Sequence, residues 1–370
     1  MATKYTRGKD GYYTTKVWDG TYNQDGSKHR KTIRSDKSSR DLERQVAALK
    51  AQVESRAYVK KTDILFYDYA KSWLVVYKSR RENNTKAMYD NIIEKHLSAI
   101  TVRLMDIERI HIEMVLNNAD GHPRTQQQIL LTFSQILKSA VSDKLLAANV
   151  AEDILSNTDK IKYKPIESRP LTPAERKAVF MADYRYPSDQ AYVYLIYGCG
   201  LRREECVALT VFDFNFKANT VSISKAYEYT QNTPGLKDPK SYNGFRTVPI
   251  PAKILPVVRE YVESVKRSGQ TNLFVTMRDK KPLTKSAYDK MWIRIVSAMQ
   301  ETSEEKFVKL TGHVFRHNYC SSLCYQIPKI SIKRIAQLMG DTEAMVMKVY
   351  SHILMEMEDV EGAVNAAMNF

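Results

Sequence analysis

The spacing of apolar residues changes twice along the chain, and these changes limit the folds that it can adopt. Between residues 62 and 158, apolar and aromatic side chains recur at helical spacing, with almost no alternation of the kind seen in strands. The helices are predicted at Asp63–Tyr77, Lys86–Leu97, Met105–Leu116 and Arg124–Val141. We therefore expect an all-α domain of four or five helices, about ninety residues long.

Residues 1–55 have a different pattern. Gly11–Trp18 is rich in aromatic and β-branched residues and is followed by Asp19-Gly20, a hairpin-turn signal. Asp25-Gly26 is a second such signal, and Lys28–Arg34 is typical of a further strand. Ser38-x-x-Asp41 resembles a capping box, and it opens a helix whose apolar face holds Leu42, Val46, Leu49 and Val53. The prediction is a small α+β module of three short strands and one helix.

The remainder of the chain, residues 167–370, is predicted to be a mixed α/β domain. Lys160–Pro165 is basic, has no helical period and is typical of a linker. Thr172 and Glu175 have the residue types of an N-cap and its capping-box partner, so a helix begins there. Two strands interrupt the helical patterns, at Thr220–Ser224 and Phe245–Ile250. The whole chain is expected to be multidomain and mainly α, with small β-sheets.

The charge balance indicates a polyanionic partner. The chain has 57 Lys and Arg against 42 Asp and Glu, a formal net charge of +15, and nucleic acid is the commonest polyanion. Residues 1–40 alone carry ten basic and four acidic residues, interleaved with Tyr and Trp. That composition suits contact with a DNA duplex, and it equally suits a solvated hairpin face.

Composition excludes several other classes of protein. Hydrophobic residues make up 43% of the chain, too many for global disorder. No apolar segment follows the N-terminus, and the longest uncharged run, Thr125–Leu137, is too short to cross a membrane. We therefore expect neither a secretory signal nor a membrane span. The four cysteines form no C-x-x-C pair and favour buried thiols in a reducing cytoplasm; they are Cys199, Cys206, Cys320 and Cys324.

Three short segments of the last domain carry residue types suited to phosphate chemistry. The first, from Tyr197 onward, contains glycines followed by Arg202 and Glu205. In the second, His313 and Arg316 are three residues apart and share a helix face, which pairs a titratable donor with a fork-shaped one. The third contains Gly340-Asp341 and then Tyr350. Each segment alone is weak evidence for a phosphate site, since such residues are common on protein surfaces and in cores.

In this order and at these intervals, the segments resemble the tyrosine recombinase (phage integrase) family. That family has an arginine in a G-L-R-x-x-E box, a lysine in a β-hairpin, an H-x-x-R box, a G-H/W pair and a tyrosine nine residues later. The resemblance assigns the catalytic positions to Arg202, Lys240, His313, Arg316 and Tyr350.

Two positions need separate comment. Lys240 precedes the strand Arg246–Pro249 and is the preferred hairpin lysine, with Lys237 as the nearby competitor. Asp341 stands where the family usually has a histidine or tryptophan. Because a carboxylate repels phosphate, we expect Asp341 to act differently, by accepting a hydrogen bond from a neighbouring donor and orienting it. Glu205 is expected to brace a nearby basic side chain.

The resemblance implies a site-specific DNA recombinase that works through a 3′-phosphotyrosine intermediate to integrate and excise a mobile element. It also implies that residues 1–55 are an arm-binding module and residues 62–158 a core-binding domain. No cofactor and no metal is implied, because two arginines and a lysine supply the positive charge. The implied partners are core-site and arm-site double-stranded DNA, a homo-tetramer on that DNA, and, as candidates, an excisionase and a host DNA-bending protein.

The implied location is the bacterial cytoplasm, in association with the nucleoid and not with a membrane. The main alternative is a catalytically inactive DNA-binding regulator on the same fold, which Asp341 keeps open. A chromosome-dimer resolvase and a type IB topoisomerase fit the modular layout less well, since such resolvases generally lack an arm-binding domain.

Overall fold

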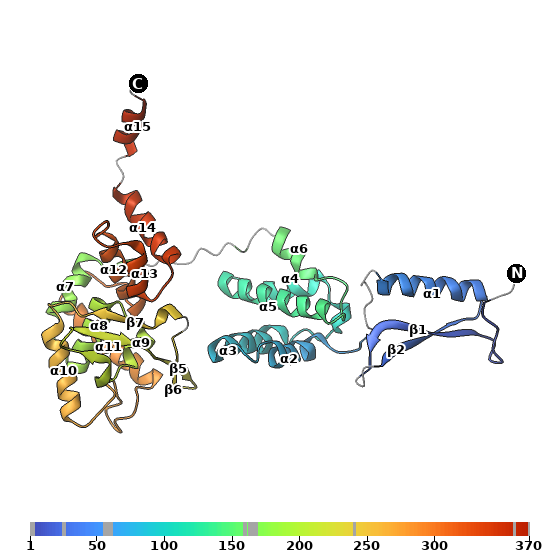
Figure 1. The fold of residues 1–370 in the computed structure, drawn as a ribbon, viewed down its shortest axis with the longest axis horizontal. Coiled ribbons are helices and arrows are strands. Elements are labelled where there is room, and N and C mark those ends of the chain that lie inside the picture. The colour runs from blue at the N-terminus through green and yellow to red at the C-terminus, as the bar shows by residue number, and fades with distance from the viewer. Residues whose placement is uncertain are drawn as a thin grey trace. The chain divides into compact units, whose positions relative to one another are not determined.

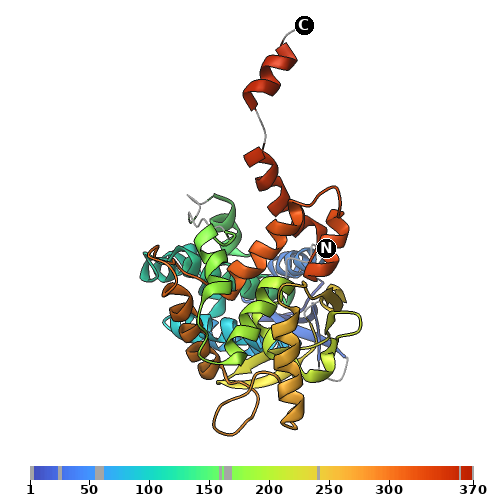
Figure 2. The same cartoon turned by 90° about the vertical axis from the view of Figure 1, so that its left-hand side faces the viewer.

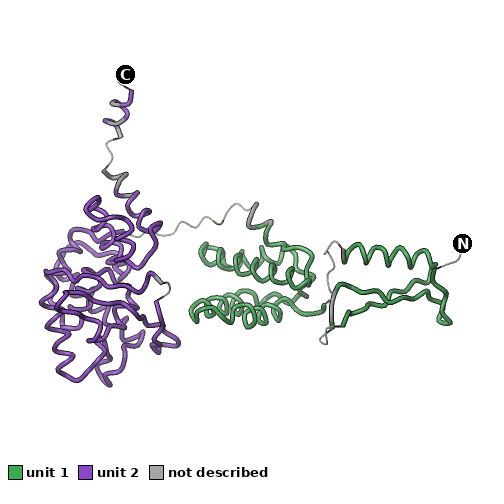
Figure 3. The backbone as a smooth tube through the Cα atoms, in the orientation of Figure 1, with its two compact units in different colours: residues 1–165 green, residues 166–370 purple. Residues whose placement is uncertain are grey.

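The chain is divided into two compact units, residues 1–165 and 166–370 (Figures 1 and 3). The structure is a computed structural model that describes residues 4–23, 27–54, 62–157, 161, 169–239, 242–357 and 360–368. None of the helices in these ranges is both long enough and apolar enough to cross a membrane. The predicted linker lies almost entirely outside the described residues, and the division into three domains stays a prediction.

The N-terminal sheet differs from the prediction in two respects: the described residues form two strands and not three, and one of the two expected turns is part of a strand. The described residues form two antiparallel strands, β1 (Tyr13–Tyr22) and β2 (Lys28–Ser35), and a single bridge from Arg7 to Tyr13. The prediction of a turn at Asp19-Gly20 was wrong, because β1 continues through both residues. The pairing register shifts between Trp18 and Tyr22, and Gly20 has a φ of +87°, so the Asp-Gly pair forms an irregularity within the strand. The expected turn at Asp25-Gly26 lies outside the described residues.

Helix α1 (Ser39–Glu54) covers one face of this sheet. The hydroxyl of Ser38 accepts a hydrogen bond from the backbone N–H of Asp41, which confirms the predicted helix start. The predicted apolar face is also confirmed, since Leu42, Val46 and Leu49 are buried in one cluster. Val17 and Ile33 join that cluster from the two strands, and the small core therefore lies between helix and sheet.

The rest of the first unit is helical, as predicted. The second helix begins at Asn83, three residues before the predicted start at Lys86. The elements are α2 (Phe66–Tyr77), α3 (Asn83–Ile92), the π-helix η1 (Ile93–Leu97), the 3-10 turn η2 (Leu104–Asp106), α4 (Arg109–Asn118), α5 (Pro123–Ser142) and α6 (Val150–Asn157).

Aromatic side chains from α2 and α5 form the centre of this helical core. The rings of Phe66 and Phe133 stack with centroids 4.5 Å apart, and both residues are fully buried. The indole N–H of Trp73 donates to the hydroxyl of Ser139 at 2.9 Å, so its one polar atom is satisfied inside the core.

The second unit surrounds small sheets with helices (Figure 2). Its helices are α7 (Pro173–Met181), α8 (Pro187–Cys199), α9 (Arg203–Val207), η3 (Val211–Asp213), η4 (Tyr242–Gly244), α10 (Leu255–Arg267), α11 (Lys285–Gln300), α12 (Gly312–Cys324), α13 (Ile332–Met339), α14 (Glu343–Met357) and α15 (Val360–Met368). Its strands are β3 (Phe214–Asn215), β4 (Thr220–Ile223), β5 (Ala226–Thr230), β6 (Thr233–Lys237) and β7 (Arg246–Pro249).

Strands β3, β4 and β7 form an antiparallel sheet in that order, and β5 pairs with β6 in a separate hairpin. The two strands predicted from their residue pattern correspond to β4 and β7, whereas that pattern did not predict the strands β5 and β6. The capping box at the start of α7 is confirmed, because Thr172 and Glu175 exchange side-chain and backbone hydrogen bonds. The carboxylate of Glu175 also receives two hydrogen bonds from Arg169, each 2.6 Å long.

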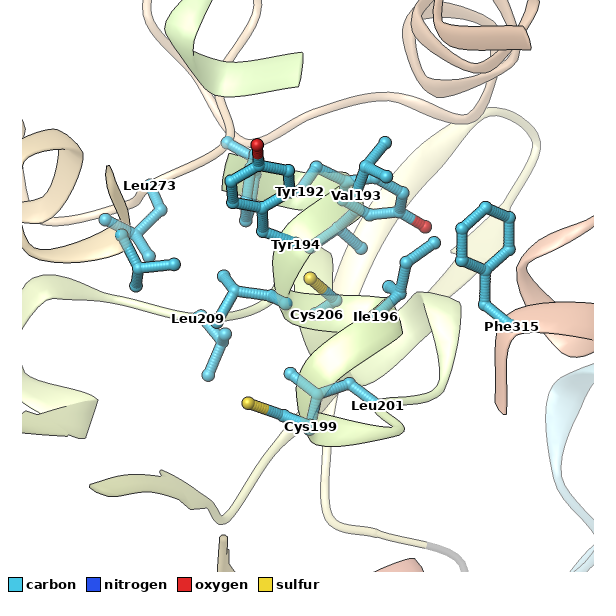
Figure 4. Packing of buried hydrophobic residues seen from close by; sticks show 14 of the residues in the cluster. Tyr192, Val193, Tyr194, Ile196, Cys199, Leu201, Cys206, Leu209, Leu273 and Phe315 are labelled. Atoms are coloured by element: carbon cyan, nitrogen blue, oxygen red, sulfur yellow. The ribbon is translucent and has the colours of Figure 1, made fainter. Parts of the chain in front are cut away.

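Helix α8 lies at the centre of the second unit. Both its flanks are buried, and it contacts α9, α10, α11 and α12. Figure 4 shows Tyr192, Ile196 and Cys199 of α8 beside Cys206 of α9 and Phe315 of α12. The backbone of α8 is thus fixed immediately before the first predicted catalytic segment and beside the helix that carries the second.

Replacing the stacked Phe133 by alanine is expected to loosen the helical part of the first unit. Removing a fully buried phenylalanine costs about 3–5 kcal/mol. Leu131 on the same helix is 49% exposed, and its replacement by alanine is expected to cost about 0.5 kcal/mol or less. Hydrogen–deuterium exchange of peptides from α2 and α5 should therefore speed up at least about a hundredfold in Phe133→Ala and little in Leu131→Ala. Equal protection in both variants would contradict the assigned core.

Candidate active site

Arg202 is placed by a sharp turn between α8 and α9. Gly200 ends α8 in the left-handed conformation, with a φ of +60°, and a Cβ atom there would overlap the ring of Tyr319. After this turn Arg202 is extended and lies just before the first residue of α9. Its backbone N–H donates to Glu205 Oε2 at 2.9 Å, and its Nη1 donates to Glu205 Oε1 at 2.9 Å. The G-L-R-x-x-E segment is therefore a helix start held by its own glutamate.

Arg316 joins the H-x-x-R segment to the first one. It lies on α12 and is only 3% exposed. Its Nη1 donates to the carbonyl oxygen of Gly200 at 2.8 Å, and its Nη2 donates to the carbonyl oxygen of Met339. Arg316 thus ties together the ends of α8 and α13. His313 lies one turn earlier on α12, where its side chain is exposed.

Asp341 lies between the two arginines. It follows Gly340, the residue that ends α13, and its Oδ2 atom accepts a hydrogen bond from Arg202 Nη2 and another from Arg316 Nη2, each 3.2 Å long. The structure agrees with the hypothesis that Asp341 accepts hydrogen bonds from neighbouring donors. The two donors are the predicted catalytic arginines themselves.

Arg246 belongs to the site but was not predicted as a site residue. Its Nη1 and Nη2 atoms donate to the carboxylate of Glu205 at 3.1 and 2.7 Å, and its Nε donates to the carbonyl oxygen of Leu338. Both members of this ion pair are buried. The pair connects β7 to α9 and to α13. The sequence signal was the Arg-Thr-Val-Pro strand, which identifies a strand but not the burial of its arginine.

The electrostatics of the site follow from this crowding of charges. Burial alone would raise the pKa of Glu205, but the hydrogen bonds and charge of Arg246, with those of Arg202, lower it to about 2. Burial and the charge of Arg202 lower the pKa of Arg316 to about 10. Partial desolvation of the ring and the positive charges of Arg316 and Arg202 lower the pKa of His313. The site therefore keeps its carboxylate ionised and favours a neutral imidazole at neutral pH.

Tyr350 lies on α14 and is half buried. Its ring packs against a cluster that contains Cys320 and Cys324 of α12 and Val346 of α14. The hydroxyl makes no hydrogen bond with any other described residue. The structure thus brings Arg202, Arg316 and Asp341 into direct contact, whereas Tyr350 forms no hydrogen bond with either arginine.

The predicted lysine, Lys240, lies outside the described residues. The competitor Lys237 ends β6, and its Nζ lies 3.8 Å from Glu228 Oε1 on β5. Lys225, just before β5, forms a shorter ion pair with Asp213, at 2.6 Å. Within the described ranges, no group of three or more His, Cys, Asp or Glu side chains is arranged to hold a metal ion.

Removing the charge of Glu205 is expected to destabilise the second unit. A glutamate whose pKa falls from 4.5 to about 2 on folding adds about 3 kcal/mol of stability at pH 7. That stability is complete above pH 4.5 and is lost as the pH falls toward 2. Urea unfolding followed by hydrogen–deuterium exchange of peptides from α8 and α9 should therefore show a large loss of stability in Glu205→Gln at pH 7 and less than half of that loss at about pH 3.

Glu204→Gln is the matched control. It removes the same charge from the neighbouring residue, whose ion pair with Arg203 is partly exposed. It should change the free energy of unfolding by about 1 kcal/mol or less. A Glu205→Gln variant that is no less stable than Glu204→Gln would show that the buried pair does not hold the site together.

Solved structures with a similar fold include integrases in complex with DNA. The integrase of transposon Tn1549 bound to a circular intermediate DNA aligns over 79% of this chain and 99% of its own, with a TM-score of 0.67 and 18% identity. A lambda integrase tetramer bound to a Holliday junction aligns over 93% of both chains, with a TM-score of 0.57 and 14% identity. At these identities the likeness establishes the fold.

Curated relatives match over shorter stretches. The tyrosine recombinase XerA of Pyrococcus furiosus is 27% identical over 165 residues, which is 45% of this chain and 50% of that protein. The transposase from transposon Tn916 of Enterococcus faecalis is 24% identical over 179 residues, 46% of this chain and 44% of that protein. The chain thus spans about half the length of these two curated relatives.

The family model covers every position that the sequence predicted for the site. The model of the phage integrase family matches residues 171–357, slightly more than half of the chain. This range includes Arg202, His313, Arg316 and Tyr350 in the order in which the sequence presents them. The chain therefore belongs to the phage integrase family.

Proposed function

We propose that this protein is a site-specific DNA recombinase that integrates and excises a mobile element. The observation that carries the proposal is the convergence of Arg202 and Arg316 on one oxygen atom, that of Asp341, at 3.2 Å from each. Two guanidinium groups aimed at one oxygen suit the non-bridging oxygen of a phosphodiester. Membership of the phage integrase family and the likeness to integrases bound to DNA support the same activity.

In the proposed reaction Tyr350 is the nucleophile. Because phenol has a pKa of about 10, its oxygen carries a proton at neutral pH. The oxygen loses this proton as it forms a bond to phosphorus. The bond from phosphorus to the 5′-oxygen breaks, and that oxygen leaves as a hydroxyl after taking a proton from Lys240. The products are a 3′-phosphotyrosine and a free 5′-hydroxyl. A 5′-hydroxyl of the partner strand then attacks the phosphotyrosine and restores both the DNA and the tyrosine.

The arginines stabilise the charge that develops on the phosphate during both steps. Arg316 is buried and held by two carbonyl oxygens, so its guanidinium needs no reorganisation when charge builds up. Glu205 accepts a hydrogen bond from Arg202, and Arg246 in turn donates to Glu205. These contacts hold the side chain of Arg202 in place. A neutral His313 can accept the proton of Tyr350 or donate a hydrogen bond to the phosphate.

The open face of the N-terminal sheet is the proposed arm-site DNA contact. Val17 and Ile33 are buried on the α1 side, so their neighbours along each strand point to the other side. On that side Trp18 lies opposite Arg30, and Lys16 lies opposite Thr32. Basic and aromatic side chains at paired positions on an exposed sheet suit phosphate and groove contacts.

The assembly and the mobile element belong to the same proposal. Recombination between two duplexes requires four nucleophiles, so we infer a homo-tetramer on core-site DNA, as is seen for lambda integrase on a Holliday junction. A transposon is the proposed element, since Tn916 and Tn1549 proteins are among the relatives. The hypothesis also includes an excisionase and a host DNA-bending protein as partners, and association with the bacterial nucleoid.

One observation favours the alternative, a catalytically inactive DNA-binding regulator. The carboxylate of Asp341 already occupies a donor atom of both arginines. A regulator of this kind would bind the same DNA without covalent chemistry.

Tyr350→Phe separates the two functions. The wild-type protein is expected to form a covalent adduct on nicked core-site DNA that survives detergent, with Tyr350 as the modified residue in peptide mass analysis. The variant should lose the adduct completely and keep its DNA affinity within about threefold, because one hydroxyl among many contacts is removed. Tyr325→Phe, at an exposed tyrosine, is the matched control and should keep the adduct.

An adduct that persists in Tyr350→Phe would refute the assigned nucleophile. Tight DNA binding without any adduct in the wild-type protein would favour the regulator.

Deleting residues 1–55 is expected to weaken binding to arm-site DNA and to spare cleavage at the core site. The substitution Arg30→Ala should act in the same direction, and the slope of log affinity against log salt should fall by about 0.9 for each phosphate that the protein no longer binds. Electrophoretic shifts with the ends of the element at several salt concentrations measure both effects. Lys50→Ala, on the exposed side of α1, is the control. Loss of core cleavage in the deletion would contradict the proposed module boundary.

A further inference from the structure

The environment of Asp341 is unusual for a carboxylate beside a phosphate site. One of its oxygens accepts hydrogen bonds from two guanidinium groups whose residues are 139 and 25 positions away in the sequence. Its other oxygen accepts one from the backbone N–H of the next residue, Thr342, at 3.0 Å. The side chain is 28% exposed, which makes it the more accessible of the two carboxylates that contact Arg202.

The remaining partners of Arg316 are fixed parts of the backbone. Its Nη1 and Nη2 atoms donate to the carbonyl oxygens of Gly200 and Met339, at the ends of α8 and α13. Among the described residues, Asp341 is the side chain that accepts a hydrogen bond from Arg316. A ligand anion that approaches this guanidinium therefore meets Asp341.

The other carboxylate of the site cannot move in the same way. Glu205 is only 2% exposed and binds Arg246 with two hydrogen bonds. It also accepts the backbone N–H of Arg202. Releasing it would leave a buried arginine without its counter-charge, which is strongly unfavourable. Asp341 has no comparable anchor, since its turn contact is to a backbone N–H at the surface.

We propose that Asp341 is an internal substitute for the scissile phosphate. In the protein without DNA its carboxylate holds the Nη2 atoms of Arg202 and Arg316 around one oxygen. When a phosphodiester binds, a non-bridging oxygen takes that place and Asp341 turns toward solvent. This inference rests on the proposed function for the identity of the ligand.

The proposal has a measurable consequence for anion binding. A phosphate must displace a carboxylate that is attracted to the same two cations, so Asp341 weakens its binding. Removing the charge should strengthen phosphate binding about fivefold to tenfold, the effect expected when two partly exposed ion pairs are lost. If Asp341 served only to hold the arginines in position, its removal would weaken anion binding instead.

The test is calorimetric titration of the full chain with inorganic phosphate in the absence of DNA. Asp341→Asn keeps the shape of the side chain and removes its charge, and Glu343→Gln removes the same charge from an exposed position two residues away. We expect about fivefold to tenfold tighter phosphate binding in Asp341→Asn and less than twofold change in Glu343→Gln. The double variant Asp341→Asn with Arg202→Gln should lose the gain.

Three results would overturn the proposal. These are phosphate binding in Asp341→Asn that is equal to or weaker than that of the wild type, an equal gain in Glu343→Gln, or a gain that persists in the double variant. If Asp341→Asn does not fold, as judged by near-ultraviolet circular dichroism, Asp341→Ser replaces it, because its hydroxyl can still accept the N–H of Thr342. The same three results then decide.

The DNA-cleavage assay separates this inference from the proposed function. Tighter phosphate binding in Asp341→Asn together with covalent adducts on DNA supports both. Tighter binding without an adduct in any variant supports the anion site and contradicts the recombinase. Adducts in the wild type with unchanged phosphate binding support the recombinase and contradict the role of Asp341.

Discussion

The buried carboxylate of Glu205 is the interaction on which the candidate site depends. It lies at the start of α9 and binds the side chain and backbone of Arg202 and the side chain of Arg246 on β7. A single glutamate thus holds a helix start to a strand that is 41 residues further along the chain. Burial makes this pair expensive to break, because either partner alone would be an unpaired charge in a medium of low dielectric constant. The position of Arg202 follows from this constraint.

Backbone carbonyl groups make a second set of contacts in the site. Arg316 donates to the carbonyl oxygens of Gly200 and Met339, which lie at the ends of two helices where such groups lack partners within the helix. One buried guanidinium therefore satisfies two helix ends and keeps its own charge inside the protein. Asp341 completes the arrangement by accepting from both arginines. The groups that stabilise the site are also those proposed to bind the anion, because the proposed reaction places a phosphate where the protein now has its own carboxylate.

Some of the fold could be predicted from neighbouring residues. The helix starts at Ser38 and Thr172 depend on side chains that reach backbone groups three residues away, and both were confirmed. The apolar face of α1 depends on helical spacing and was also confirmed. The Asp19-Gly20 pair was misinterpreted as a turn, because the same dipeptide also fits a strand irregularity. The carboxylate of Asp19 lies 2.6 Å from His29 on the neighbouring strand, a contact that local pattern does not reveal.

The sequence by itself determined the types and order of the residues that identify the family, from Arg202 to Tyr350, since these are properties of short segments at given intervals. Only the tertiary structure decided that Arg246 is buried against Glu205 and that Asp341 lies between two arginines. These contacts join residues 25 to 139 positions apart. Their geometry depends on how α8, α12 and α13 pack around a shared core, because packing, and not local propensity, fixes the distance between groups remote in sequence.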